Sequence, residues 1–146
     1  MPINRRRGFA HERDLAKRLY EHGFAVMRAP ASGSKAKHLI YPDLIAIYQG
    51  KIIACEIKTS KKPRPIYIDK YQVDKLIDFT RRSGGEAYIA VKTIGSGIWT
   101  FIPLDQLERT ERGRYKITKD LISKGIKLGA LIATIKGVKK LTDFTK

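Results

Sequence analysis

Two apolar segments on either side of a short turn constrain the fold of this chain most strongly. Residues 43–48 and 51–59 are rich in apolar residues, and Gln49-Gly50 between them is typical of a two-residue hairpin turn. Alternate positions point to opposite faces of a strand, and both faces of this hairpin are apolar. Both faces must therefore be covered, which favours an α/β sheet flanked by helices over an exposed antiparallel sheet.

The register of this hairpin brings two acidic residues together. If Tyr48 pairs with Lys51 across the turn, Asp43 lies directly opposite Glu56 on one face of the sheet. Opposed residues have Cβ atoms about 4.5–5.5 Å apart, and like charges there are destabilising unless a cation lies between them. Lys58 follows Glu56 by two residues and points to the same face. Two acids that converge on a divalent metal beside an ammonium group suit phosphodiester hydrolysis.

Helices and strands are predicted on both sides of the hairpin. We expect a helix over residues 9–22 with Glu12 on its apolar stripe, a strand over 24–29, a second helix over 69–83, and a hairpin with strands over 86–93 and 98–102. Residues 104–109 are predicted as a short helix and residues 115–117 as an edge strand. One domain is expected over residues 1–146, in which 1–8 form a mobile basic arm and 126–146 have a weak assignment, with 126–135 packing on the body or in a dimer.

The charge of the chain favours a polyanionic partner. Thirty Lys and Arg residues against fourteen Asp and Glu residues give a formal net charge of +16, so nucleic acid is the first expectation and an anionic membrane surface the competitor. No apolar run approaches the roughly 20 residues of a spanning helix, and the N-terminus does not resemble a signal peptide, so an intracellular, cytoplasmic protein is expected. Cys55 is the single cysteine, which we expect to be a small core residue.

Six motifs together carry a family resemblance. They are Glu12-Arg13, residues 28–34 (Arg-Ala-Pro-Ala-Ser-Gly-Ser), residues 42–46 (Pro-Asp-Leu-Ile-Ala), Glu56-Ile57-Lys58, Tyr71-Gln72-Val73 and residues 84–88 (Gly-Gly-Glu-Ala-Tyr). In this combination, over residues 7–92, the chain resembles the archaeal Holliday junction resolvases, which belong to the restriction-endonuclease-like PD-(D/E)xK nucleases. The resemblance implies an α/β fold with a central mixed β-sheet of about five strands and helices on both faces.

The resemblance also implies roles for individual residues. Asp43 and Glu56 match the metal ligands of the family, with Glu12 completing the acidic cluster directly or through water. Lys58 would orient the attacking water and stabilise charge in the transition state. Ser32 matches a loop serine near the scissile phosphate, and Gln72 matches a helix residue that supports the site. The family further implies Mg²⁺, a homodimer, and paired incisions in a four-way junction by two equivalent sites.

Basic residues close to these motifs are expected to hold DNA phosphates. Such contacts weaken with salt and carry no base information, which agrees with recognition of branched shape rather than sequence. The candidate DNA-binding residues are Arg5, Arg6, Arg7, Arg13, Arg28, Ser34, Lys35, Lys37, Lys61, Lys62 and Arg64. Residues 140–145 resemble a degraded sliding-clamp-binding peptide.

Several alternatives stay open at the level of the sequence. Asp43 suits an ordinary turn, and Glu56 with Lys58 an exposed ion pair. Gln72 completes a capping box with Asp69 without any catalytic role. Ser32 suits a tight loop, and Glu12 an ion pair with Arg13 or Lys17. At the level of function, the alternatives are a related nuclease that cuts mismatched, nicked, flap or site-specific duplex DNA, and a non-enzymatic basic nucleic-acid-binding protein.

Overall fold

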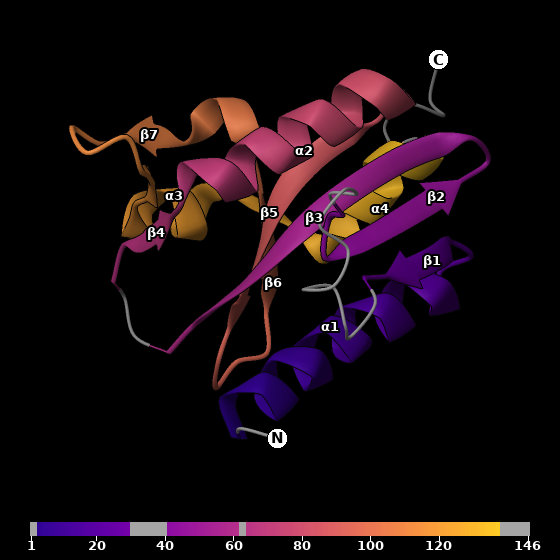
Figure 1. Cartoon of the computed structure of the whole chain (residues 1–146). Coiled ribbons are helices and arrows are strands. Elements are labelled where there is room, and N and C mark those ends of the chain that lie inside the picture. Colours follow the sequence, from indigo (N-terminus) through magenta and orange to yellow (C-terminus); the bar gives the residue numbers. More distant parts are fainter. Residues whose placement is uncertain (1–2, 30–40, 62–63, 138–146) are drawn as a thin grey trace, which may run out of the picture.

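A mixed six-stranded sheet forms the centre of the molecule (Figure 1). The structure is a computed structural model that describes residues 3–29, 41–61 and 64–137, with side chains from residue 9 onward. Strands β3 and β5 run parallel, and every other neighbouring pair in this sheet is antiparallel. In spatial order, the strands are β1 (Ala25–Arg28), β2 (Leu44–Tyr48), β3 (Lys51–Ser60), β5 (Glu86–Thr93), β6 (Trp99–Pro103) and β9 (Ile126–Lys127). The predicted mixed sheet is confirmed, with the short β9 added at one edge.

Helices cover both faces of this sheet, as the apolar hairpin predicts. Helices α1 (Ile3–Glu21) and α4 (Leu128–Lys136) pack on one face, where Leu15, Leu131 and Phe101 are buried in a common cluster. Helices α2 (Lys70–Ser83) and α3 (Lys119–Lys124) pack on the other face, against a cluster that includes Leu76 and Ile89. Each face of β3 therefore contributes to a separate hydrophobic core. None of the described helices has the length and apolar character needed to cross a membrane.

The hairpin has the predicted register. Tyr48 pairs with Lys51 and Leu44 with Cys55, and the next position places Asp43 opposite Glu56. Gln49 and Gly50 both have positive φ, at 46° and 82°, as the favoured tight hairpin turns require. Cys55 is fully buried, which confirms its assignment to the core.

The N-terminal prediction is wrong in one respect. Helix α1 begins at Ile3 rather than near residue 9, so residues 3–8 continue the helix and are not a separate arm. Arginine is among the better helix formers, so a run of three arginines extends a helix despite its charge.

A second, three-stranded sheet was not foreseen. Its order is β4 (Ile66–Ile68), β8 (Tyr115–Ile117) and β7 (Glu108–Arg109). Residues 115–117 are a strand as predicted, but they belong to this sheet and not to an edge of the central one. The helix predicted over 104–109 is reduced to the single 3₁₀ turn η2 (Leu104–Gln106). Strand β4 begins directly after Pro65, in a stretch of three residues for which no element is predicted.

Residues 126–135 pack on the body of the protein, one of the two predicted outcomes. They comprise β9 at the sheet edge and most of α4, in which Leu131, Ile132 and Ile135 are buried. Trp99 and Phe101 are likewise in the core, at 2% and 0% exposure.

Candidate active site

Two carboxylates meet at the end of the β2–β3 hairpin. Asp43 immediately precedes β2, and its side-chain Oδ2 accepts a 2.8 Å hydrogen bond from the backbone N–H of Ile57. Its backbone carbonyl accepts another, at 2.9 Å, from Ala29 at the end of β1. Glu56 lies in the middle of β3 with its side chain only 4% exposed. Asp43 is thus fixed by backbone groups on both sides and held beside a buried acid.

The environment of Glu56 disfavours its charged form. Its pKa is raised to about 7 by burial and by the neighbouring charge of Asp43, while Lys75 opposes both effects. Its Oε2 atom is buried and accepts no hydrogen bond within the described part of the chain. A buried carboxylate with one oxygen that accepts no hydrogen bond, beside a second acid, is an arrangement that a divalent cation would stabilise. The donor set therefore fits a hard metal ion with oxygen ligands.

Glu12 approaches the same acids from helix α1. Its pKa is raised to about 7 by burial and, to a lesser extent, by the charge of Asp43, with Arg28 opposing both effects. The three carboxyl groups are electrostatically coupled through Asp43. In residues 3–29, 41–61 and 64–137, however, no three acidic, histidine or cysteine side chains are close enough to ligate one ion together. The geometry agrees with the expectation that Glu12 acts through water better than with direct ligation.

Helix α2 contributes the side chain of Gln72 to the site. Gln72 donates from Nε2 to Glu56 Oε1 at 3.4 Å and accepts from Lys58 Nζ at 3.1 Å. Its side chain therefore links the second acid to the predicted catalytic lysine. Asp69 is the N-cap residue of α2 but makes no side-chain cap hydrogen bond. The predicted capping box is absent, and Gln72 belongs to the acidic site.

Lys75 is the residue that the sequence analysis missed. Its Nζ lies 3.0 Å from Glu56 Oε2 and 3.2 Å from Oε1, and its side chain is 12% exposed. Lys75 follows Gln72 by three residues, so both side chains lie on one side of α2. That spacing was the available signal, because the placement of Gln72 near the acids implies the same for Lys75.

A second polar cluster, also missed, anchors α1 to the strands β5 and β6. Asp14 accepts hydrogen bonds from Trp99 Nε1 at 2.9 Å and Arg18 Nε at 3.1 Å, and Lys92 Nζ lies 2.9 Å from its Oδ2. Burial alone would raise the pKa of Asp14, but these donors outweigh it and hold the pKa at about 2. Lys92 also contacts His11, whose pKa is lowered by burial and by this charge. The cluster fixes the helix that carries Glu12.

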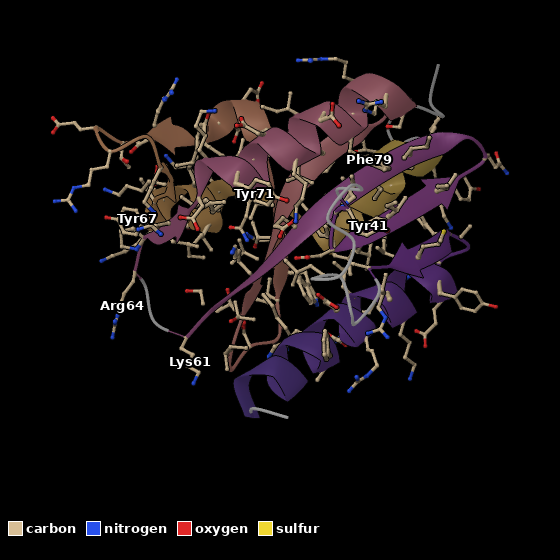
Figure 2. The ribbon with its side chains drawn as sticks, viewed as in Figure 1. Tyr41, Lys61, Arg64, Tyr67, Tyr71 and Phe79 are labelled. Carbon is tan, nitrogen blue, oxygen red and sulfur yellow. The ribbon has the colours of Figure 1, made fainter. Side chains whose placement is uncertain are left out.

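The predicted DNA-binding residues are only partly described. Arg13, Arg28, Lys61 and Arg64 are exposed, and Arg28 donates to the Phe9 carbonyl at 3.4 Å. Lys61 and Arg64 line a pocket beyond the end of β3, and Figure 2 shows both side chains projecting away from the ribbon. Arg5, Arg6 and Arg7 are placed by the backbone of α1 alone. Ser32, Ser34, Lys35, Lys37, Lys62 and residues 140–145 lie outside the described residues.

Comparisons with known proteins agree with this site. Residues 3–140 match the model of the family described as archaeal Holliday junction resolvase (hjc). The chain is 43% identical, over 90% of both sequences, to the crossover junction endodeoxyribonuclease Hjc of Sulfurisphaera tokodaii, and 40% identical, over 92% of both, to that of Sulfolobus acidocaldarius. The solved structure of Hjc from Archaeoglobus fulgidus, described as a Holliday junction resolvase, superposes with a TM-score of 0.75. At 31% identity, that superposition covers 92% of this chain and 98% of that one.

Proposed function

This chain belongs to the family of archaeal Holliday junction resolvases, and we propose that Asp43, Glu56 and Lys58 are the groups with which it cuts DNA. Membership makes it an endodeoxyribonuclease that acts on four-way DNA junctions in recombination and repair. The observation that carries the proposal is the buried carboxylate of Glu56 beside the second acid Asp43, with Oε2 accepting no hydrogen bond from the described residues. A structural ion pair would have no need of a second acid at that position.

The proposed cofactor is Mg²⁺, held by Asp43 and Glu56 with Glu12 in an outer position. Nucleases of this kind depend on a metal, and Mg²⁺ keeps several waters while binding one or two carboxylates, which fits a two-acid site. When bound, such an ion neutralises phosphate charge and lowers the pKa of a coordinated water. The resting pKa of about 7 for both Glu56 and Glu12 makes these acids responsive to a nearby cation at neutral pH.

Lys58 is proposed to orient the attacking water and to stabilise charge as it develops on the phosphate. Lys58 Nζ is bonded to Gln72 Oε1 rather than ion-paired with either acid, so its charge remains available to the phosphate. Gln72 is a positioning residue, because it links this ammonium group to Glu56. Ser32, which lies between β1 and β2 in the sequence and outside the described residues, is proposed as a hydrogen-bond donor to a phosphate oxygen.

Basic residues next to the site are proposed to hold the arms of the junction by their phosphates. Those described with side chains are Arg13, Arg28, Lys61 and Arg64, all exposed. A homodimer is proposed because two symmetric strands must be cut by two equivalent sites. A sliding clamp is the remaining proposed partner, through residues 140–145.

The deciding experiment removes each acid while conserving its shape. Asp43→Asn and Glu56→Gln are expected to reduce cleavage of a labelled four-way junction by more than about 100-fold. A loss of that size exceeds the roughly 10–100-fold effect of residues that only support the metal ligands. Junction binding, measured by fluorescence anisotropy, should remain or become tighter because negative charge is lost. Asp105→Asn, at an exposed position in η2, is the control and should cleave normally.

The same assay tests the metal and the substrate. Cleavage should require added Mg²⁺, and a linear duplex of equal sequence should be cut far more slowly than the junction. Persistent cleavage by Asp43→Asn or Glu56→Gln would show that these acids are not the catalytic pair.

A further inference from the structure

We propose that Lys75 is the internal counter-ion of Glu56, whose charge substitutes for that of the divalent ion in the metal-free protein and is displaced when the metal binds. The proposal deepens the proposed function and rests on it, because it requires that Asp43 and Glu56 form the metal site. It assigns to Lys75 a positioning role distinct from that of Lys58. The two lysines differ in what they contact.

The geometry separates the two ammonium groups. Lys75 Nζ lies 3.0 Å from Oε2 and 3.2 Å from Oε1 of Glu56, so it faces both carboxylate oxygens. Lys58 Nζ donates instead to Gln72 Oε1 at 3.1 Å. The positive charge that balances the buried acid is therefore that of Lys75, which comes from helix α2 and not from the strand of the Glu-x-Lys motif.

Burial distinguishes this pair from the other ion pairs of α2. The side chains of Lys75 and Glu56 are 12% and 4% exposed, whereas those of Lys70 and Asp74 are 54% and 48% exposed. A buried carboxylate without a partner is strongly destabilising, so the contact with Lys75 is what the acid site needs when no metal is present. Lys70 belongs to the same helix but pairs with its acid in solvent, which makes it a matched control.

The contact is also of a kind that a metal ion can replace. Glu56 Oε2 lies within ion-pair distance of Lys75 but accepts no hydrogen bond from any described group, so charge rather than directed bonding holds it there. A divalent cation on the same oxygen would repel the ammonium group at close range. The lysine side chain has a flexible four-carbon stem, so its head can leave while its backbone stays in α2.

Metal affinity follows as a competition. The free protein binds a metal ion only by breaking the ion pair between Lys75 and Glu56. The affinity of Asp43 and Glu56 for the metal is therefore lowered by the energy of that ion pair. Removal of the lysine charge should tighten metal binding, because it removes a favourable interaction that only the metal-free state has. A purely structural lysine would give the opposite result, because its replacement would loosen the site.

Calorimetric titration of the DNA-free protein with Mg²⁺ and with Ca²⁺ tests this competition. Lys75→Met is expected to bind each ion about tenfold or more tightly than the wild type, and Lys75→Arg, which keeps the charge, should stay close to the wild type. Lys70→Met should leave the affinity unchanged. Equal or weaker metal binding by Lys75→Met, with normal binding by the wild type, overturns the proposal and leaves the metal site in place.

The variant Asp43→Asn distinguishes failure of the proposal for Lys75 from failure of the proposed metal site. Its loss of metal binding supports the acid site on which the competition depends. If Asp43→Asn binds metal as the wild type does, the acid site is misassigned and the proposed role of Lys75 is also wrong.

A measurement on the wild-type protein covers the case in which Lys75→Met does not fold. Lysine acetylation, followed by mass spectrometry, should modify Lys75 slowly without metal and several-fold faster when Ca²⁺ is bound, because the displaced ammonium group becomes accessible. Lys70 should react equally in both states. Unchanged protection of Lys75 at a saturating metal concentration overturns the proposal.

Discussion

At the scale of single residues, the site is defined by which donor meets which acid. The sequence leaves two roles open for Gln72, a helix cap and a support of the acid site. In the structure its side chain bonds to Glu56 and Lys58, and Asp69 makes no side-chain cap hydrogen bond. A glutamine suits this place since its amide donates to one group and accepts from the other. No charged residue could do both.

Replacement of Gln72 by Ala should slow cleavage without weakening junction binding. We expect the single-turnover rate to fall by about 10–100-fold, the range for groups that orient catalytic ligands, because Lys58 and Glu56 lose their common partner. Quenched-flow cleavage of a labelled junction measures the rate, and anisotropy measures the affinity. Gln106→Ala, at an exposed position, is the matched control. A wild-type rate in Gln72→Ala would limit the residue to a structural role.

Metal binding should be coupled to proton release near neutral pH. Glu56 and Glu12 both have a pKa raised to about 7, so a substantial fraction is protonated at pH 6 and little at pH 8. Because a metal binds the ionised form, affinity should increase as the pH rises through 7. Calorimetry at pH 7 in two buffers of different ionisation enthalpy detects the released proton. Identical heats in both buffers would contradict these pKa values.

At the scale of elements, the acid site exists because three segments converge near the middle of β3. The hairpin supplies Asp43 and Glu56, helix α1 supplies Glu12, and helix α2 supplies Gln72 and Lys75. The Asp14 cluster ties α1 to β5 and β6, so it governs how firmly Glu12 is held.

Asp14→Asn should destabilise the protein in a pH-dependent way. The pKa of Asp14 is about 2 in the folded protein against an ordinary 3.8, so its contribution is complete above about pH 4 and is lost as the pH falls towards 2. We expect the variant to lose about 1–3 kcal/mol of unfolding free energy at pH 7, and the difference from the wild type to shrink in acid. Urea unfolding at several pH values measures both.

The exposed pair of Asp74 with Lys70 provides the control for that experiment. Asp74→Asn should cost only about 0.3–0.5 kcal/mol at pH 7, as is usual for an exposed helix pair. If the difference in unfolding free energy between Asp14→Asn and the wild type does not change with pH, the loss of stability does not come from the ionised carboxylate of Asp14.

Sequence patterns predicted the elements whose signals are local. The turn at Gln49-Gly50 and the alternation around it fixed the register, and hence the opposed acids. The Asp14 cluster and Lys75 depend on contacts between segments far apart in sequence, which no periodicity encodes. Strands β4, β7 and β9 have two or three residues each, too few for an alternating pattern to be recognised.

At the scale of the whole molecule, a net charge of +16 has to be reconciled with a site built from acids. The acids are buried or partly buried near the end of the hairpin, while the described basic candidates around them are exposed. We propose that the exposed basic residues hold phosphates of the junction arms, whereas the acids hold the metal at the phosphate that is cut. The curated relatives are endodeoxyribonucleases, which disfavours a non-enzymatic nucleic-acid-binding protein.

The basic residues at the end of β3 should determine part of the salt dependence of junction binding. Replacing both Lys61 and Arg64 by Gln should make the slope of log affinity against log salt less steep by about 0.9 for each phosphate that is no longer neutralised. The cleavage rate of bound junction should change little. Lys124→Gln, which removes a lysine already paired with Asp120, is the control and should leave the slope unchanged. Equal slopes for the double variant and the wild type would remove these residues from the DNA surface.

The parallel pairing of β3 with β5 has a consequence for the chain while it is being synthesised. The two strands can pair only after all of α2 has been made, because β4 and then α2 lie between β3 and β5 in the sequence. A nascent polypeptide that ends at Ser60 already contains Asp43 and Glu56, yet it lacks Gln72 and Lys75, which order and neutralise Glu56. The acid site in the form described here therefore cannot be complete until the growing chain extends beyond α2.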